Sequence, residues 1–266
     1  MIRSLPKNPR ATEGFSLIEL MIALVAGLIV VGAVLAFTVS SVQANAEFVK
    51  STRLTQELRN VTDYITSELK RAGYDEAAMD YVANPSSLAV SVFAPILVDT
   101  TAGKNCVIYA YDRQPGTPGG VDAGNGEIRA IRRATTTLDG QEIGVIEVAE
   151  STATVTPACN GAAPDYSKYP AECNASSGWC ALSDPRLISI TAFVVDTVAA
   201  GTRSRGVQTI PAASGFNAMQ LREYGVTISG ALRSDAAIAR TVQSTIKVRA
   251  DCLRASVSSC AAAPTP

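Results

Sequence analysis

The chain has 266 residues, of which 47% are hydrophobic and 18% charged, and its formal net charge is −1. This length allows one sizeable domain beyond an N-terminal segment, and the near-neutral charge argues against the broad basic surface of nucleic-acid binding proteins. Because the sequence contains no histidine, a histidine-based triad and a histidine general base are excluded.

The N-terminus combines a short basic leader with a long apolar segment. Basic residues at positions 3, 7 and 10 precede a run of 25 residues, Phe15 to Val39, in which Glu19 is the only charged residue. About 20 residues suffice to span the hydrocarbon core of a bilayer. A carboxylate inside such a span costs roughly 2.5–3.5 kcal/mol at mid-bilayer, so Glu19 indicates a function that involves a partner.

Two general interpretations account for only part of this segment. A secretory signal peptide fits the basic leader and the small residues of Ala44-Asn45-Ala46, but its apolar region would be about 7–15 residues long and uncharged. A plain single-span anchor, with the basic leader on the cytoplasmic side, fits the length. It leaves Glu19 unexplained.

A third interpretation accounts for the whole segment. Gly14 is followed by Phe15, and Glu19 is the fifth residue after the glycine. This pattern, ahead of an unbroken apolar run, resembles the class III signal of type IV pilins and type II secretion pseudopilins. The resemblance implies that a prepilin peptidase cleaves between Gly14 and Phe15 at the cytoplasmic face and that Phe15 is then N-methylated.

Cleavage of this kind would give Glu19 a partner. The new α-amine of Phe15 would lie at about the depth of the Glu19 carboxylate of a neighbouring subunit. Two such charges attract strongly in a low-dielectric helix bundle and are costly when separated. We therefore expect Glu19 to set the axial register as helices enter a filament.

The apolar segment continues into an amphipathic one. Between positions 43 and 72, apolar residues recur at spacings of three and four, as one helical face requires, and Gly73 supplies a C-terminal stop. A continuous helix from Phe15 to Ala72 would be about 87 Å long. We expect its second half to pack on the chain's own sheet, rather than form an independent coiled coil, through Leu54, Leu58, Val61, Ile65, Leu69 and Ala72.

Short β-like runs follow Gly73. Asn125-Gly126 predicts a tight hairpin between two of them, and long surface loops are expected at 154–183 and 198–217. Strands that follow one long helix predict an α+β fold, in which an antiparallel β-sheet domain with disulfide-stapled loops packs on the helix. The predicted strands are Leu88–Ala94, Cys106–Tyr111, Glu127–Arg133, Ile143–Val148, Leu187–Val195, Tyr224–Leu232 and Thr241–Val248.

All six cysteines lie beyond the apolar segment, which suggests disulfides formed in an oxidising periplasm. Three bridges allow fifteen connectivities, and the sequence does not choose among them. A zinc site is disfavoured because the chain has no histidine and no C-x-x-C pair. One candidate pairing joins Cys173 to Cys180 in one loop and Cys252 to Cys260 in the tail, and leaves Cys106 with Cys159.

Candidate ligand groups are few. Asp122, Asn125 and Glu127 do not have the spacing of a calcium-binding loop, and a hairpin turn explains them better. The arginines at positions 129, 132 and 133 are expected on a solvated face of a strand, with an acidic partner surface or DNA as the minor alternative. The sequence predicts no enzymatic activity, no metal and no cofactor.

Several motifs, which occur in order between residues 106 and 195, resemble one particular group within the pilins. The stretches 106–112, 125–129 and 178–179, followed by Leu182-Ser183-Asp184-Pro185 and the strand after it, resemble the PilW group of type IV minor pilins. The near alternative is the J-type minor pseudopilin of type II secretion. The PilW resemblance implies a low-abundance structural subunit that joins other minor pilins in a complex that primes pilus assembly, either at the tip of the pilus or close to its base.

The resemblances also imply an organisation and a set of partners. Residues 1–14 would be a cleaved leader, 15–39 the span and filament-core helix, 40–73 its amphipathic continuation and 74–266 a periplasmic domain. The protein would cross the inner membrane once and then enter the pilus. Its partners would be the prepilin peptidase, other minor pilins and the major pilin, with a tip adhesin as a further candidate. A membrane-anchored periplasmic binding module that never polymerises is the remaining alternative.

Overall fold

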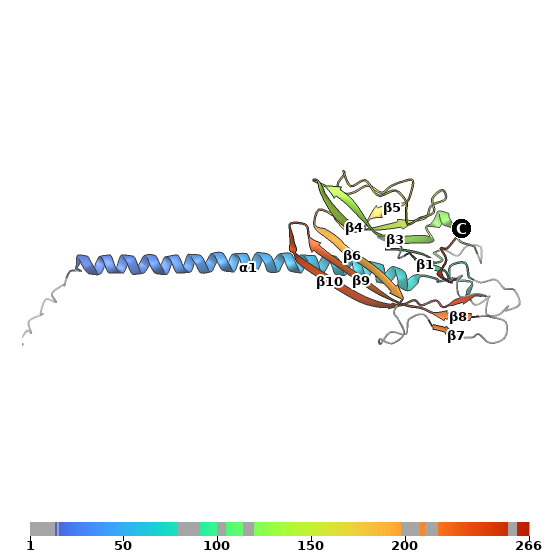
Figure 1. The fold of residues 1–266 in the computed structure, drawn as a ribbon, viewed down its shortest axis with the longest axis horizontal. Helices are drawn as coiled ribbons and strands as arrows, with labels where there is room; N and C mark the ends of the chain where they lie inside the picture. Colours follow the sequence, from blue (N-terminus) through green and yellow to red (C-terminus); the bar gives the residue numbers. More distant parts are fainter. Residues whose placement is uncertain are drawn as a thin grey trace, which may run out of the picture. The chain divides into compact units, whose positions relative to one another are not determined.

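The computed structural model describes residues 14, 16–78, 91–99, 105–113, 120–197, 208–210, 218–254 and 260–265. In this part of the chain a long α-helix precedes antiparallel strands (Figure 1). The elements are α1 Leu17–Arg71, β1 Ile96–Asp99, β2 Cys106–Ala110, the 3-10 helix η1 Ala123–Asn125, β3 Ile128–Leu138, β4 Gln141–Glu150, β5 Trp179–Ala181, β6 Ile188–Thr197, β7 Gln208–Ile210, β8 Ala218–Leu221, β9 Glu223–Leu232, β10 Asp235–Lys247 and β11 Cys252–Arg254.

Helix α1 has 55 residues and ends where the sequence predicts a stop. Gly73 adopts a left-handed conformation with φ +79°, which glycine tolerates without steric cost. Its N–H donates to the carbonyl of Ala110 at 2.8 Å, so the chain turns from the helix toward β2. The chain divides into two units, Met1–Val49 and Lys50–Pro266, and the second contains the last part of α1 and the strands.

The strands form three sheets in which hydrogen-bonded neighbours are antiparallel. Their orders are β1-β2-β3-β4-β5, β10-β9-β6 and β11-β8-β7. Neighbours in sequence are mostly neighbours in space, as in hairpin-connected sheets. This arrangement confirms the predicted α+β fold with a long N-terminal helix.

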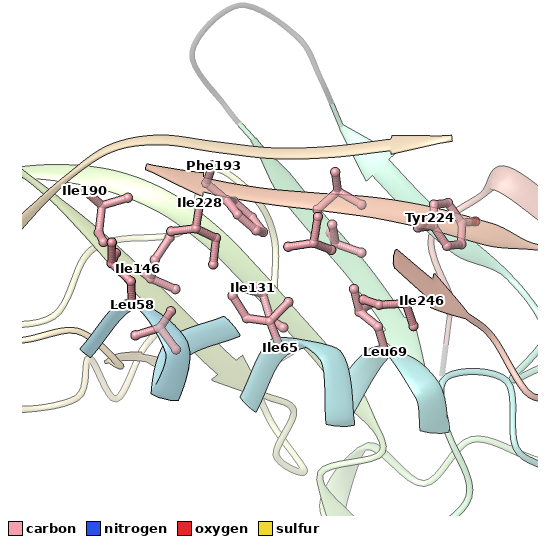
Figure 2. Packing of buried hydrophobic residues seen from close by; sticks show 14 of the residues in the cluster. Leu58, Ile65, Leu69, Ile131, Ile146, Ile190, Phe193, Tyr224, Ile228 and Ile246 are labelled. Carbon is pink, nitrogen blue, oxygen red and sulfur yellow. The ribbon is translucent and has the colours of Figure 1, made fainter. Parts of the chain in front are cut away.

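The main core lies between the last part of α1 and two of these sheets. Leu58, Ile65 and Leu69 of the helix point toward the strands in Figure 2, where side chains such as Ile131 of β3 and Phe193 of β6 meet them. The predicted helical stripe is confirmed, because each of its members is at most 4% exposed: Leu54, Leu58, Val61, Ile65, Leu69 and Ala72.

The five-stranded sheet is covered on its second face as well. Strand β2 is buried at every position, because its side chains alternate between the main core and a second cluster. This second cluster centres on Trp179, which is fully buried, and includes Phe93, Ile108 and Ile128. From the segment between β4 and β5, Cys159 packs against this cluster, and the Ala158 carbonyl accepts a hydrogen bond from Trp179 Nε1 at 3.1 Å.

Strands β4 and β6 approach each other so closely that only glycine fits at position 144. A Cβ atom built on Gly144 would lie 1.9 Å from the carbonyl oxygen of Ile190. The Gly144 N–H donates to Ser189 Oγ at 3.1 Å, and Arg133 Nε donates to the Ile190 carbonyl at 2.8 Å. These bonds join the five-stranded sheet to the sheet that contains β6.

The strand predicted at 88–94 is wrong over its described part. Residues 88–90 lie outside the described residues, and 91–94 form a turn in which Ala94 N–H donates to the Ser91 carbonyl at 3.2 Å. Strand β1 begins just after Pro95, whose ring removes a backbone donor and which therefore suits the start of a strand.

The tight hairpin predicted at Asn125-Gly126 is also wrong. Asp122 caps a short 3-10 helix by accepting a hydrogen bond from Gly124 N, and Gly126 ends this helix in the left-handed region. The two-residue hairpin lies instead at Asp139-Gly140, where both residues have positive φ and Leu138 pairs with Gln141. Asp-Gly is a strong signal for such a turn.

The two predicted long loops have different outcomes. The segment 154–183 contains β5 and an isolated antiparallel bridge between Asp165 and Glu172, so it is partly regular. Of the segment 198–217, the structure describes Gln208–Ile210 alone, and this piece is strand β7. The other predicted strands are confirmed, with ends that shift by a few residues.

Candidate functional site

The N-terminal motif is described at Gly14 and from Ser16 onward, whereas Phe15 lies outside the described residues. The backbone N–H of Ser16 donates to Glu19 Oε2 at 3.1 Å, and Leu20 N–H donates to the Ser16 carbonyl at 3.1 Å. Glu19 therefore caps the start of α1, as glutamate does at the third position of a capping box. This role was not predicted above, although Ser16 and Glu19 have the S-x-x-E spacing that signals it.

This position suits a carboxylate for a second reason. The first turn of a helix carries unpaired N–H groups and the positive end of the helix dipole, which stabilise a negative charge. Glu19 is exposed, so its second oxygen is open to solvent or to another chain. The arrangement can accept a cation without breaking any buried contact.

The first part of α1 is apolar and exposed. Its large apolar side chains between Leu17 and Val49 are each more than half exposed. By length and composition, α1 is a helix able to cross a membrane in the described part of the chain. An exposed apolar surface of this extent indicates contact with lipid or with other helices.

A buried charged cluster joins α1 to the five-stranded sheet. Glu68 of α1 is 4% exposed, and its Oε2 accepts hydrogen bonds from Arg129 Nη1 at 2.8 Å and from the hydroxyls of Tyr109 and Tyr111, each at 3.2 Å. Arg129 also pairs with Glu150. Buried charges of this kind are tolerated because the carboxylates and the guanidinium pair with one another, and among the described members of the cluster Arg129 Nε is the buried side-chain atom left without a hydrogen-bond partner.

The buried cluster around Glu68 raises the pKa values of Tyr109, Tyr111 and Arg129. Burial raises the pKa of Tyr109 well above its ordinary value, and the Glu68 carboxylate raises it further. The pKa of Tyr111 is raised for the same two reasons. Burial is the largest single influence on the pKa of Arg129 and lowers it, but the charges of Glu68, Tyr111, Glu150 and Tyr109 together outweigh burial, so the pKa is raised. The tyrosines therefore stay neutral donors and the arginine stays charged.

A second buried pair lies on the other face of the same sheet. Arg132 Nε donates to Glu147 Oε2 at 2.7 Å, and Tyr166 donates its hydroxyl proton to Glu147 Oε1 at 2.8 Å. The Arg132 guanidinium also lies 4.0 Å from the ring centroid of Trp179. Burial and the Glu147 carboxylate both raise the pKa of Tyr166.

These contacts correct the prediction of a solvated arginine face. Arg129 and Arg132 are only 7% and 5% exposed, and Arg133 is bound to the Ile190 carbonyl. The sequence could not reveal this, because the five-stranded sheet is covered on both faces, Arg129 and Arg132 meet the carboxylates of Glu68 and Glu147, and Arg133 meets a backbone carbonyl of another sheet. The three side chains are therefore structural groups.

The six cysteines form three disulfides, Cys106–Cys159, Cys173–Cys180 and Cys252–Cys260. This is the candidate pairing named from the sequence. Cys106–Cys159 ties β2 to the segment that covers the sheet, where Arg132 Nη1 donates to the Cys159 carbonyl at 3.0 Å. Cys252 and Cys260 form a small buried cluster with Ala94.

The residues considered as calcium ligands serve the turn instead. Asp122 Oδ1 accepts from Gly124 N at 2.8 Å, and Glu127 Oε2 accepts from Asp122 N at 2.6 Å. The Asn125 amide donates to Asp122 Oδ2. Among the described residues, no group of three His, Cys, Asp or Glu side chains is placed to hold a metal ion.

Comparison with known families agrees with this geometry. Residues 9–35 match the prokaryotic N-terminal methylation motif, which is the class III prepilin signal predicted from the sequence. Together with a long N-terminal helix packed on antiparallel sheets, this match defines a type IV pilin-like protein. Families of this class are structural subunits rather than enzymes, and their processing makes the prepilin peptidase a partner.

The particular family follows from a second match. Residues 47–248 match the family described as prepilin peptidase-dependent protein B. This match covers more than half of the chain, so the chain belongs to that family. No curated protein and no solved structure matches the chain.

Proposed function

We propose that this chain is a minor pilin, a non-enzymatic subunit that joins other minor pilins in the complex that primes type IV pilus assembly. The observation that carries this proposal is that α1 begins with Glu19 in an exposed position and continues as a half-helix whose large apolar side chains are each more than half exposed. Such a helix needs lipid or neighbouring helices around it. Within the minor pilins, we infer that the chain acts as the PilW group does, on the motifs of residues 106–112, 125–129 and 178–185 that resemble that group.

In this proposal the protein is processed, held in the inner membrane and then assembled. A prepilin peptidase cuts after Gly14, the new N-terminal Phe15 is methylated, and the segment 15–39 holds the protein in the inner membrane. The domain beyond residue 73 then lies in the periplasm, where its three disulfides form in an oxidising environment. The other minor pilins and the major pilin receive the helix during assembly.

Glu19 has two partners in this scheme. Before assembly its carboxylate caps its own helix through Ser16 N–H. During assembly the α-amine of Phe15 in a neighbouring subunit offers a full positive charge, which attracts a carboxylate more strongly than a neutral N–H does. The exchange fixes the axial register between the two helices.

A gene deletion complemented by variants tests the proposal. Wild type and the control Glu47→Val, which removes an exposed charge from the same helix, are expected to restore surface pili and twitching. Glu19→Val is expected to insert and be cleaved normally, yet to restore at least tenfold fewer pili, because the amine loses its partner. Normal piliation by Glu19→Val contradicts the proposed role.

The same deletion separates the pilus from the alternative machinery. The class III signal is shared by minor pseudopilins of type II secretion systems, which makes them the second candidate. If the deletion abolishes exoprotein secretion and leaves pili intact, the chain is a pseudopilin. If a protein that retains its leader is functional in both assays, a non-polymerising membrane-anchored module is the better account.

A further inference from the structure

A cavity of about 240 Å³ lies far along the chain from the N-terminal motif. Its walls are the loop 165–172 and the turn 181–186 after β5. The side chains that line it include Tyr166, Tyr169, Pro170, Leu182 and Arg186. The volume suits one side chain of a partner, since pockets for whole small molecules commonly measure about 300–1,000 Å³.

The first wall is held rigidly. Asp165 and Glu172 exchange two backbone hydrogen bonds, of 2.9 and 3.1 Å, across the base of the loop. Lys168 Nζ pairs with Glu172 at 2.6 Å. The Cys173–Cys180 disulfide then joins the end of this loop to β5. A wall fixed at three points loses little conformational entropy when a ligand binds.

The second wall and the floor are fixed as well. Ser183 Oγ accepts a hydrogen bond from Ile146 N at 2.9 Å, which anchors the turn to β4. Asp184 Oδ1 accepts from the backbone N–H of Arg186 at 2.8 Å. Tyr166 is 6% exposed, and its hydroxyl is committed to Glu147. The cavity is therefore formed before any ligand arrives.

The mouth of the cavity presents a cation on an exposed ring. The Arg186 guanidinium lies 4.4 Å from the ring centroid of Tyr169, and Tyr169 is 67% exposed. Within the described residues, the Arg186 side chain forms no ion pair with a carboxylate; the Asp184 carboxylate, which also lines the cavity, accepts a hydrogen bond from the Tyr169 hydroxyl at 3.4 Å instead. An arginine stacked on a ring holds its planar donors in one orientation and can bind a carboxylate through two hydrogen bonds.

We propose that this cavity binds a protein segment that carries a carboxylate beside an apolar side chain. The apolar group enters between Tyr169, Pro170 and Leu182, and the carboxylate lies against the Arg186 guanidinium. Tyrosine and arginine are also the residue types that contribute most binding energy at protein interfaces. This inference does not depend on the proposed role in pilus assembly, because it uses none of the N-terminal residues.

Titration of the full chain in detergent with a small probe tests the inference. The probe is the dipeptide of phenylalanine and aspartate, blocked at both ends, and its neutral analogue contains asparagine in place of aspartate. NMR shifts are expected at the Tyr169 and Leu182 signals with the acidic probe, with at least tenfold weaker binding of the neutral analogue.

Variants assign the binding to the proposed groups. Arg186→Gln is expected to weaken binding of the acidic probe at least tenfold, and Arg186→Lys, which keeps the charge without the planar fork, should have a smaller effect. Arg59→Gln, which removes an exposed arginine from α1, serves as the control and should change nothing.

Four results would overturn the inference. They are equal binding of the two probes, an equal effect of Arg59→Gln and Arg186→Gln, absence of binding at millimolar probe, and binding of a disaccharide at this cavity in preference to the acidic dipeptide. The last result would assign the exposed ring to sugar recognition instead.

Discussion

At the scale of single residues, Glu68 is the group that fixes α1 to the five-stranded sheet. Its replacement by glutamine would leave Arg129 buried with one carboxylate, Glu150, instead of two. Removing one partner of a buried pair generally costs about 3–5 kcal/mol, and because Glu150 remains, we expect Glu68→Gln to lower the free energy of unfolding by about 2–4 kcal/mol.

Urea unfolding of the full chain in detergent measures this change. Asp63→Asn is the matched control, because Asp63 lies one turn earlier on α1 and is exposed; it should shift the free energy by less than about 0.5 kcal/mol. Equal effects of the two substitutions would contradict the role given to Glu68.

The buried tyrosines predict a loss of stability at alkaline pH. Burial and Glu68 raise the pKa of Tyr109 in the folded state above the ordinary value of 10.0, so folding favours the neutral hydroxyl. The stabilisation is complete below pH 10, where Tyr109 is also neutral in the unfolded chain. It is lost as the pH rises toward the folded-state pKa, because only the unfolded chain releases its proton there.

Unfolding free energies at about pH 8 and about pH 10.5 test this prediction. Tyr109→Phe should be less stable than wild type by about 0.5–1.5 kcal/mol at the lower pH and should show a smaller decrease between the two values. Tyr74→Phe, at a ring that is 55% exposed, should retain the wild-type decrease. An unchanged decrease in Tyr109→Phe argues against this assignment.

At the scale of elements, the patterns with a regular period could be predicted and the contacts between distant segments could not. The apolar stripe from Leu54 to Ala72 has the 3.6-residue period of one buried helical face, and it alone indicates the packing of α1. The strands rich in Val and Ile were predictable for a similar reason. The end of β3 shifted because Asp139-Gly140 sets the turn between β3 and β4.

The buried arginines show what a single sequence does not contain. Arg129 and Arg132 lie on a strand whose pattern allows either a solvated or a buried face. Their burial depends on Glu68, 61 residues earlier in the chain, and on Glu147, 15 residues later. By contrast, the capping role of Glu19 was recoverable, because the S-x-x-E spacing is local.

The close contact between β4 and β6 predicts that a larger residue at position 144 destabilises the fold. Gly144→Ala would place a Cβ atom 1.9 Å from the Ile190 carbonyl oxygen, so the two strands must separate. We expect a loss of about 1–3 kcal/mol, as for an overpacked core, measured by urea unfolding. Glu142→Ala, on the same strand at an exposed position, should be near neutral. A stable Gly144→Ala variant would show that the strands can move apart freely.

At the scale of the whole molecule, the two ends of α1 have different physical requirements. The last part is satisfied within the chain, where the sheets cover its apolar stripe. The first part exposes its large apolar side chains, and Glu19 caps its start through the Ser16 N–H. The chain therefore buries the apolar stripe of the last part of α1 by itself but leaves the apolar surface of the first part exposed. This exposed apolar surface is the central reason for proposing that the protein assembles with other subunits.

The N-terminus of the mature protein tests this account most directly. Mass spectrometry of the protein purified from cells that contain prepilin peptidase should find a chain that begins at Phe15 and carries one added methyl group on its α-amine. In cells that lack the peptidase, the same protein should begin with the leader. A mature chain that retains Met1, or one cleaved near Ala46 by a signal peptidase, would contradict the account.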